Sequence, residues 1–238
     1  MTKLKTLITP FNFFYIYSLH PAMNYVFTIV KIRFFNLIFA LNMAETQKIV
    51  SPQAGFQERF VRSNVDVVIG GGVLSCGKTS GAVLAMAEPT LDPQFRAVFL
   101  RNNLGDLKSG GGILDEFRNI YGSKGCSVIE SGDPHVDFPS GARVDVTHIA
   151  DQSYDKVMQR FKGRQYDCIY FDEMTGFTWE CFSAVCTRNR GKSKKWTGKI
   201  RGTTNPDRDH WLRTFLDWYI GIDGFIREDR EGVVRYFF

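Results

Sequence analysis

The sequence predicts an α/β fold in which a mostly parallel β-sheet is covered by helices on both faces. Short apolar runs alternate with segments of helical periodicity from about residue 65 to residue 219. Such alternation is typical of parallel strands that are joined by helical crossovers. A glycine-rich turn follows the first apolar run, and an acidic pair follows a later one. Both are therefore expected at the carboxyl ends of strands, where open α/β sheets bind ligands.

The length and composition are those of an ordinary globular protein. The 238 residues are 44% hydrophobic and 23% charged, which is enough to bury a core without disulfides or metals. The net charge of +5 is compatible with a nucleic-acid partner but does not require one. The five cysteines include no C-x-x-C pair, and the four histidines lack metal-ligand spacing. This argues against a zinc site or a disulfide framework and fits a reducing cytosol.

Residues 1–42 differ in composition from the rest of the chain. They contain no Asp or Glu and are rich in Phe, Tyr, Ile and Asn. Lys3 and Lys5 precede an apolar stretch that resembles a signal peptide or membrane helix, but Pro21 and several Asn residues weaken a spanning helix. Three interpretations stay open: an untranslated or disordered extension with Met43 as the true start, a membrane-associating segment, and packed structure. We favour the first and expect no membrane partner.

The first half of the remaining chain predicts two strands and two helices. Residues 65–69 form an apolar run that ends in three glycines, and residues 79–87 are expected to form a helix rich in Ala, Leu and Met. A second apolar run at residues 96–100 predicts the next strand. Residues 104–121 carry Leu, Phe and Tyr at helical spacing and therefore predict a longer helix.

The second half begins with a predicted hairpin at residues 135–149, whose turn is the Pro-Ser-Gly sequence at 139–141. An apolar run at residues 168–171 predicts a buried strand, and residues 199–203 predict a further strand. Helices are expected at residues 151–161, 178–188 and 210–219, and a final hairpin is expected at residues 224–237.

The turn after the first strand matches the phosphate-binding pattern G-x-x-x-x-G-K-[ST] at every fixed position. Glycines let backbone N–H groups turn towards phosphate oxygens, and the helix that begins near Lys78 adds the positive end of its dipole. The pattern assigns Lys78 to the β and γ phosphates and the Thr79 hydroxyl to Mg²⁺. An incidental glycine-rich turn is the alternative, but the position between a strand and a helix favours ATP. The predicted nucleotide-binding residues in this run are Gly72, Ser75, Cys76, Gly77, Lys78 and Thr79.

The acidic pair Asp172-Glu173 directly follows the apolar run at residues 168–171. A P-loop enzyme holds its Mg²⁺ with a carboxylate at a neighbouring strand end, and Asp172 suits that role. Glu173 is then placed to polarise the attacking water as a general base. An ordinary exposed strand end is the alternative. With the phosphate loop upstream, the pair favours an ATP hydrolase with the fold of a P-loop NTPase, a RecA/ASCE-like three-layer sandwich.

Several segments also resemble those of a known family. The most discriminating is Gly202-Thr203-Thr204-Asn205-Pro206 followed by His210-Trp211, because generic P-loop motifs do not predict it. The others are Phe56-Gln57, Phe99-Leu100-Arg101-Asn102-Asn103 with Asp106-Leu107, and Phe161-Lys162-Gly163 through Phe171-Asp172-Glu173-Met174-Thr175. Through these segments, residues 51–238 resemble the ATPase domain of bacteriophage large terminase subunits.

The resemblance implies an ATPase motor that packages double-stranded viral DNA into procapsids. It implies that Gln57 contacts adenine and that Thr203, Thr204 and Asn205 couple hydrolysis to DNA movement. The implied partners are a portal protein, a small terminase subunit and further copies of the chain in a ring. The implied location is the bacterial host cytoplasm, transiently at the procapsid portal. Another P-loop DNA-dependent ATPase and a truncated, non-catalytic terminase remnant are the alternatives.

Two features depart from the family pattern. The phosphate loop holds Val73, Leu74 and Cys76, where many members have small residues or an Arg. The family's C-terminal nuclease domain has no counterpart in the sequence, so nuclease activity is not expected. We therefore expect an N-terminal extension at residues 1–42, an ATPase domain at 43–222, and a hairpin or linker at 223–238 that leads towards the missing nuclease domain.

Arginines and lysines outside these motifs supply further candidates. Arg101 follows a strand and is a candidate catalytic residue that senses the γ-phosphate or reaches a neighbouring subunit; a solvated loop arginine is the alternative. A basic run with no acid between Glu180 and Asp207 is usually a solvated surface. In a DNA motor such a run can also contact phosphates or supply an arginine finger. Its members are Arg188, Arg190, Lys192, Lys194, Lys195, Lys199 and Arg201.

Overall fold

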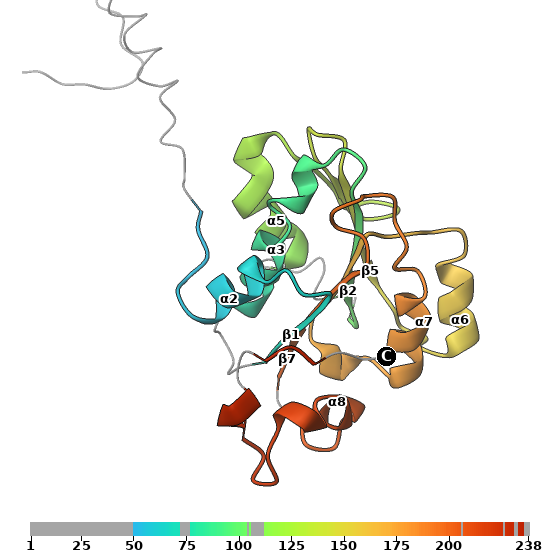
Figure 1. The fold of residues 1–238 in the computed structure, drawn as a ribbon. Coiled ribbons are helices and arrows are strands. Elements are labelled where there is room, and N and C mark those ends of the chain that lie inside the picture. The colour runs from blue at the N-terminus through green and yellow to red at the C-terminus, as the bar shows by residue number, and fades with distance from the viewer. Residues whose placement is uncertain are drawn as a thin grey trace, which may run out of the picture. The chain divides into compact units, whose positions relative to one another are not determined.

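The computed structural model describes residues 50–71, 77–103, 105, 112–205, 207–225, 227–230 and 233–235. The chain divides into two units, Met1–Ile49 and Val50–Phe238, and only the second contains described residues (Figure 1). The extension expected at residues 1–42 and the start expected at Met43 lie outside them. Among the described helices, none combines the length and the apolar character that a membrane crossing requires.

A seven-stranded sheet forms the centre of this unit, in the order β1-β7-β6-β2-β5-β4-β3. Five neighbouring strands pair in parallel, namely β1, β7, β6, β2 and β5. Strands β4 and β3 extend the sheet beyond β5 with antiparallel pairing. The predicted mostly parallel sheet is therefore confirmed. The strands are β1 Val67–Gly71, β2 Arg96–Arg101, β3 Ser127–Ile129, β4 His135–Asp137, β5 Arg143–His148, β6 Cys168–Phe171 and β7 Lys199–Thr204.

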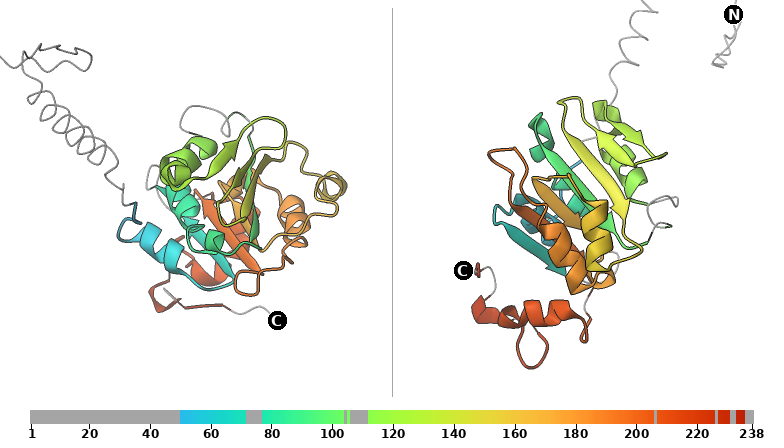
Figure 2. Two further views of the ribbon diagram at one scale, coloured as in Figure 1. Left: turned by 90° about the horizontal axis from the view of Figure 1, so that it is seen from above. Right: turned by 90° about the vertical axis from the view of Figure 1, so that its right-hand side faces the viewer.

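Helices cover both faces of the sheet (Figures 1 and 2). One face carries α2, α3 and α5, and the other carries α6 and α7, with α8 packed beside α7. This arrangement confirms the predicted three-layer sandwich. The helices are α2 Phe56–Arg62, α3 Lys78–Leu84, α5 Ile113–Tyr121, α6 Tyr154–Arg160, α7 Trp179–Cys186 and α8 Trp211–Phe215. Single 3-10 turns are η1 Pro89–Leu91, η2 Gly122–Lys124, η3 Met174–Gly176, η4 Asp217–Tyr219 and η5 Glu228–Arg230.

The central strands divide their side chains between two hydrophobic cores. Successive side chains of a strand point to opposite faces of the sheet. Phe99 of β2 and Tyr170 of β6 therefore belong to the core beneath α3 and α5, where their rings stack at 5.9 Å. Leu100 and Phe171, one residue further along, belong to the core beneath α6 and α7. This two-sided burial explains why both strands are continuous apolar runs in the sequence.

The strand order separates the two predicted motif strands. We expected the strand before Asp172 to neighbour the strand before the phosphate loop, but β7 lies between β1 and β6. Gly71 of β1 is paired with Thr204 of β7, and Phe171 of β6 is paired with Gly202. The strand that carries the Thr-Thr-Asn motif is therefore the one that connects the other two.

Several local predictions were incomplete. Neither α2 nor β3 was predicted from the sequence, and β1 ends two residues later than predicted. A helix was expected at residues 104–121, and α5 forms its second half, from Ile113 onward. Between residues 104 and 111 only Gly105 is described. The helix expected at 210–219 divides into α8 and the 3-10 turn η4.

No strand of the hairpin expected at residues 224–237 occurs among the described residues of that range. The chain reverses earlier, where the Arg227 N–H donates to the Tyr219 carbonyl (2.9 Å) and the Gly221 N–H donates to the Phe225 carbonyl (2.7 Å). Gly224 has a φ of 85° in this turn, a conformation that glycine adopts without strain. The glycine therefore closes the turn instead of opening a strand, and η5 follows. The described residues of 223–238 include no strand.

Candidate active site

The carboxyl ends of four parallel strands bring the predicted catalytic residues together. β1 leads through the phosphate loop to α3, β2 ends at Arg101, β6 leads into the acidic pair, and β7 ends at Thr204. Open α/β sheets bind ligands at this edge. Predicted site residues within the described part are Gln57, Gly77, Lys78, Thr79, Arg101, Asp172, Glu173, Thr203, Thr204 and Asn205; Gly72, Ser75 and Cys76 lie outside it.

Gln57 packs directly against the end of the phosphate loop. Its Nε2 donates to the Gly77 carbonyl (2.9 Å), and its Oε1 accepts from the Gln53 N–H (2.9 Å). The side chain is buried, with 5% of the residue exposed. Gly77 has a φ of 69°, and a Cβ on it would lie 2.3 Å from Gln57 Nε2. The amide thus bonds within the protein, and the predicted adenine contact stays a prediction.

Asp172 lies at the centre of the site and is almost completely buried, with 1% of the residue exposed. Its Oδ2 accepts from the Thr79 hydroxyl at 3.2 Å, and its Oδ1 accepts a short hydrogen bond from the Thr203 hydroxyl. The Arg101 guanidinium lies 3.5 Å from Oδ2. All three contacts come from side chains at the ends of other strands or of the phosphate loop, so this carboxylate joins the four chain segments.

Glu173 has an unusual backbone conformation beside Asp172. Its φ of 55° is the one positive φ of a non-glycine residue among the described residues. Such a conformation costs on the order of 1 kcal/mol or more and is kept where surrounding contacts fix it. The Glu173 N–H donates to Thr203 Oγ1 (3.2 Å), and its carboxylate pairs with Arg101 Nη2 (3.0 Å). The strained turn aims the half-exposed carboxylate along the edge of the sheet, with Arg101 bridging both acids.

The end of β7 connects the acids to the segment that follows it. The Thr203 hydroxyl contacts both Asp172 and the Glu173 backbone, and the Thr204 hydroxyl donates to the Asn205 carbonyl (3.0 Å). Asn205 Oδ1 is buried without a hydrogen-bond partner in the described part of the chain. A buried acceptor in this state is costly, by about 1–3 kcal/mol. A shift of β7 would therefore change hydrogen bonds at both acids. The Asn205 Oδ1 atom can accept a further hydrogen bond.

A hydrogen-bond group beside the site was not recognised in the sequence. Gln152 donates to Asn102 Oδ1 (2.9 Å) and to the Gly176 carbonyl (2.7 Å), and it accepts from the Thr178 N–H (2.6 Å). It therefore links the ends of β2 and β6. No local pattern marks Gln152, because an isolated polar residue after a strand is common in loops.

The His210-Trp211 pair of the family resemblance anchors the segment after β7. His210 Nε2 and Trp211 Nε1 both contact the Phe177 carbonyl, at 3.0 and 2.7 Å. His210 Nδ1 accepts from the Leu212 N–H (3.3 Å), which assigns the proton to Nε2. The chain after Asn205 is thereby tied to the turn that follows the acidic pair.

The donor set fits Mg²⁺ with a nucleotide. Thr79 and Asp172 supply one hydroxyl and one carboxylate within 3.2 Å of each other. Mg²⁺ is usually held by one or two carboxylates together with substrate phosphates and water. No cluster of three or more His, Cys, Asp or Glu side chains suited to a metal occurs among the described residues. A Mg²⁺ at this position would therefore complete its shell from phosphate oxygens and water.

The basic run lies at the opposite, amino-terminal edge of the sheet, because most of it precedes β7. Arg201 within β7 is buried, and it donates to the carbonyls of Ser63, Val65 and Asp66 at 3.0–3.1 Å. Lys199 pairs with Asp66 (2.8 Å). The idea that these two cations are part of a solvated face or of an arginine finger is therefore wrong; both are structural.

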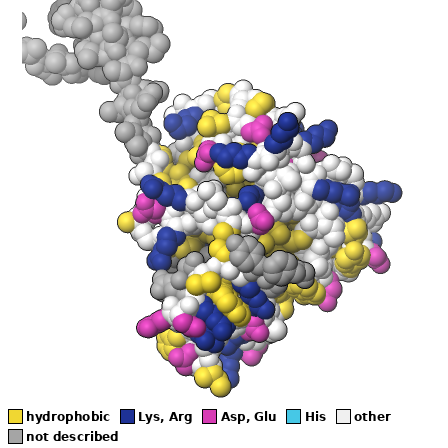
Figure 3. Space-filling model, in the orientation of Figure 1, with side chains coloured by type: hydrophobic (Ala, Val, Ile, Leu, Met, Phe, Trp, Pro, Cys, Tyr) yellow, Lys and Arg dark blue, Asp and Glu magenta, His cyan; other side chains and the backbone are white. Residues whose placement is uncertain are grey.

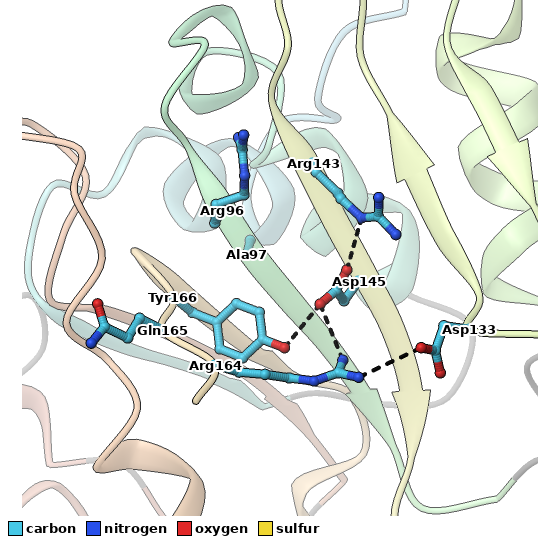
Figure 4. Close-up of a pocket in the computed structure, with 8 residues that line it drawn as sticks. All are labelled: Arg96, Ala97, Asp133, Arg143, Asp145, Arg164, Gln165 and Tyr166. Carbon is cyan, nitrogen blue, oxygen red and sulfur yellow. Dashed lines mark hydrogen bonds and ion pairs between the residues drawn. The ribbon is translucent and has the colours of Figure 1, made fainter. Parts of the chain in front are cut away.

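A surface pocket of about 260 Å³ lies at the same amino-terminal edge (Figure 4). Asp145 lies in its centre and accepts from Arg143 Nε (3.2 Å), Arg164 Nη1 (3.4 Å) and the Tyr166 hydroxyl (2.9 Å). Arg164 also contacts Asp133 at 3.6 Å. Burial raises the pKa of Tyr166 above its usual range, so its hydroxyl stays protonated. Arg143 and Arg164 are thus paired with carboxylates at this pocket, whereas Arg96 donates to the backbone carbonyls of Pro93, Phe95 and Gly141.

Comparisons with known proteins agree with this geometry. A family model described as "Terminase large subunit, T4likevirus-type, N-terminal" matches residues 69–231. The large terminase of a thermophilic bacteriophage is similar at 18% identity and a TM-score of 0.54, over 71% of this chain and 44% of that chain. The complex of the same phage terminase with ATP-gamma-S is similar at 16% identity and a TM-score of 0.51, over 70% and 42%.

A further solved structure has the same fold. The large terminase of bacteriophage HK97 is 11% identical with a TM-score of 0.52, over 73% of this chain and 38% of that chain. At these identities the structural likeness shows the fold alone. No curated protein matches the chain.

The chain spans less than half the length of the solved terminases that it resembles. The family match, in contrast, extends from within β1 to beyond α8 and covers more than half of the chain. This match includes Lys78, the acidic pair and the Thr-Thr-Asn segment. The chain therefore belongs to the family of T4-like terminase large subunit N-terminal domains.

Proposed function

We propose that the chain is the ATPase motor of a phage terminase and couples ATP hydrolysis to the packaging of viral DNA into procapsids. One observation supports this most strongly. The Asp172 carboxylate accepts hydrogen bonds from the hydroxyl of Thr79, on the helix after the phosphate loop, and from the hydroxyl of Thr203, at the end of β7. The first contact is what a Mg²⁺-nucleotide site requires. The second connects that site to the segment that is expected to respond to hydrolysis.

The residues at the carboxyl edge divide the work of hydrolysis among them. Lys78 binds the β and γ phosphates, and Glu173 accepts the proton of the attacking water as general base. Arg101, 3.0 Å from Glu173, orients that carboxylate through a charge-assisted hydrogen bond. Mg²⁺, when held by Thr79 and Asp172, would neutralise charge on the transferred phosphate.

Coupling follows from the position of β7. Its Thr203 hydroxyl contacts both acids, so a change of charge at the phosphate site alters the hydrogen bonds of this strand. The following segment, tied through Trp211 to the Phe177 carbonyl, would move with it. Asn205 Oδ1, which is buried and has no hydrogen-bond partner among the described residues, would gain a partner either before or after hydrolysis. Strain and unmet hydrogen bonds are typical of segments that switch.

The ligands and partners belong to this proposal as well. ATP is supported by the ATP-gamma-S complex of the thermophilic phage terminase, which has the same fold. Double-stranded viral DNA, a portal protein, a small terminase subunit and a homo-oligomeric ring are the partners expected of a packaging motor. The site of action would be the bacterial cytoplasm, transiently at the procapsid portal.

A steady-state ATPase assay with the purified chain tests the proposal. The chain should release phosphate from Mg-ATP, and Lys78→Ala should abolish this release. Lys124→Ala, which removes an exposed lysine in η2, should leave it unchanged. Stimulation by duplex DNA in the presence of procapsids separates a packaging motor from another DNA-dependent ATPase. Nucleotide binding without turnover in the wild-type chain would instead identify a non-catalytic remnant.

A further inference from the structure

The loop between α7 and β7, residues 187–198, is fixed from beneath by a buried carboxylate. Asp167, with 0% of the residue exposed, directly precedes β6. Its Oδ1 accepts from the Ser193 N–H (2.8 Å) and the Thr197 hydroxyl (2.7 Å), and its Oδ2 accepts from the Arg96 N–H (2.8 Å). Hydrogen bonds to a buried charge are stronger than neutral ones, so the loop has a defined conformation. We call residues 187–198 the α7–β7 loop.

Side chains along this loop alternate between inward and outward positions. Gly191 faces inward, since a Cβ on it would lie 2.0 Å from Asp167 Oδ1. Ser193 is 2% exposed, and its hydroxyl donates to Asp92 Oδ2 at 2.7 Å. This hydrogen bond is the main cause of the lowered pKa of Asp92. The residues between and beside them, Arg190, Lys192 and Lys194, are exposed. The loop thus presents three cations in a row on its outer side.

The charges of these three cations lack a paired carboxylate among the residues that the structure describes. No carboxylate in the described part of the chain forms an ion pair with Arg190, Lys192 or Lys194, whereas the adjacent Lys195 pairs with Glu88 and lies over the Trp196 ring. Of the arginines at the pocket in Figure 4, at the same edge of the sheet, Arg143 is paired with Asp145, and Arg164 is paired with Asp145 and Asp133. As far as the described residues go, the outer row of the loop is therefore a concentrated positive charge without a paired carboxylate, on a fixed backbone.

The loop lies at the edge of the sheet opposite to the nucleotide site. It enters β7 at Lys199, whereas β7 reaches the acidic pair at Thr203. In Figures 1 and 2 the loop is drawn in orange at the end of the strands away from α8. Figure 3 shows Lys and Arg side chains scattered over one face of the molecule, interspersed with Asp and Glu. The row of cations on the α7–β7 loop therefore lies away from the nucleotide site.

We propose that Arg190, Lys192 and Lys194 bind the phosphate backbone of double-stranded DNA, an inference that rests on the proposed function for the identity of the nucleic acid. Four residues of chain span at most about 14 Å. One DNA strand carries a phosphate about every 3.4 Å of helix axis, so up to about four phosphates lie within that reach. Backbone contacts of this kind position DNA without reading its sequence, as a motor that translocates any sequence requires.

The chemistry of the loop favours DNA over an acidic protein. The centres of protein interfaces are enriched in aromatic side chains and depleted in lysine. None of the strongly exposed large hydrophobic side chains in the described part of the chain lies on the α7–β7 loop. Closely spaced lysine and arginine without an apolar anchor matches a repeating phosphate chain.

Binding of a fluorescently labelled 30-base-pair duplex tests this proposal. The triple variant Arg190→Ala/Lys192→Ala/Lys194→Ala should bind about 10- to 100-fold more weakly at 100 mM salt. Its plot of log affinity against log salt should be shallower by about 2–3, because each phosphate contact contributes about 0.9 to the slope. The matched control Lys124→Ala/Lys156→Ala/Lys162→Ala removes the same charge from exposed positions and should change affinity less than about threefold.

Equal weakening in both triple variants would overturn the proposal, because net charge alone would then explain binding. Unchanged DNA affinity in the loop variant would overturn it too, and a loss of poly-glutamate binding in that variant would point to an acidic protein instead. DNA-independent ATP turnover should be the same in the loop variant and the wild type. If neither the wild type nor any variant hydrolysed ATP, the proposed function would be contradicted, but the comparison of DNA affinities would still stand.

A second variant tests whether the fixed backbone matters. Ser193→Ala/Thr197→Val keeps every charge but removes the Thr197 donor to Asp167 and the Ser193 contact to Asp92. Affinity should fall about three- to tenfold with an unchanged salt slope, because the same contacts form from a looser loop. Wild-type affinity in this variant would overturn the role of the buried carboxylate. A thermal melt of each variant shows that the fold is retained.

Discussion

Strand β6 has a buried aspartate at each end, and the two are used in opposite ways. Asp167 precedes the strand and Asp172 follows it, and both are almost inaccessible to solvent. Asp167 accepts from two backbone N–H groups and one hydroxyl, all of them parts of the fold around it. Within the described part of the chain, Asp172 accepts from side chains, namely two threonine hydroxyls and, at 3.5 Å, Arg101.

The difference separates structure from function. Backbone N–H donors are fixed by the fold, so a carboxylate that accepts from them stabilises the conformation of the surrounding backbone. Hydroxyls and guanidinium groups rotate at little cost, so the carboxylate that they satisfy can exchange them for a metal ion, and the released hydroxyl and guanidinium groups can turn to phosphate oxygens. Burial is equal at both ends, so the donors, and not the burial, distinguish the end of the strand at which we propose the active site.

Asp172→Asn should have the largest effect on activity and a small one on the fold. Bound metal contributes several kcal/mol of charge stabilisation, so turnover of Mg-ATP should fall about 10²-fold or more. The free energy of unfolding should change by less than about 1 kcal/mol, because the hydroxyl donors can turn to other acceptors. Phosphate release and urea denaturation measure the two effects. A strongly destabilised variant would show that Asp172 is structural as well.

Asp167→Asn should do the reverse. The amide nitrogen would face N–H donors, leaving buried groups unsatisfied, and we expect a loss of about 2–4 kcal/mol in unfolding free energy. For a domain of this size that lowers Tm by roughly 5–15 °C. Below the new transition the variant should still hydrolyse ATP at about the wild-type rate. If the variant lost ATP turnover while its Tm stayed unchanged, Asp167 would have a functional role and not the structural one assigned to it.

Gln57→Ala should have an intermediate effect on nucleotide binding. Because its amide supports the Gly77 carbonyl, its loss should loosen the phosphate loop and weaken ATP and GTP equally, by about five- to tenfold. Gln159→Ala, an exposed glutamine on α6, is the matched control. Weakened ATP binding with unchanged GTP binding would favour the adenine contact that the family resemblance implies.

The smallest effect concerns Cys168, which lies between the two aspartates. Burial raises the pKa of its thiol to about 12, against 9 for an ordinary thiol, so about a thousandfold less thiolate is present at neutral pH. Alkylation by iodoacetamide at pH 8 should therefore be slow, since the thiolate is the reactive form. Asp167→Asn should speed it, and Asp172→Asn should not. Rapid labelling in the wild-type chain would show that β6 opens more readily than its packing implies.

Elements and motifs with a local sequence signal were predicted correctly. The apolar run at residues 168–171 matches the observed bounds of β6, and Lys78, Thr79 and the acidic pair lie where the motif patterns place them. The insertion of β7 between β1 and β6 could not be derived, because strand order depends on packing between distant segments. The structural role of Asp167 was not predicted, although the residue directly precedes a predicted strand. Its hydrogen-bond partners are residues 96, 193 and 197, which are distant from it in the sequence.

Two glycines show the limit of local patterns. The hairpin was expected to begin at Gly224, whereas in the structure Gly224 closes a turn that begins at Tyr219. Gly77 was assigned to phosphate binding, but its lack of a side chain is also required by Gln57, twenty residues upstream. A pattern shows that a glycine is present, and only the fold shows which neighbour needs the space.

ATP turnover by the wild-type chain and by Glu173→Gln at saturating Mg-ATP decides whether hydrolysis depends on the acidic pair. Gln keeps the size of the side chain but cannot accept the proton of the attacking water. We expect turnover to fall by about 10²-fold or more, the usual scale for a positioned base, with ATP affinity within about threefold of wild type. Equal turnover by the two chains would contradict the assignment of hydrolysis to the carboxyl end of β6.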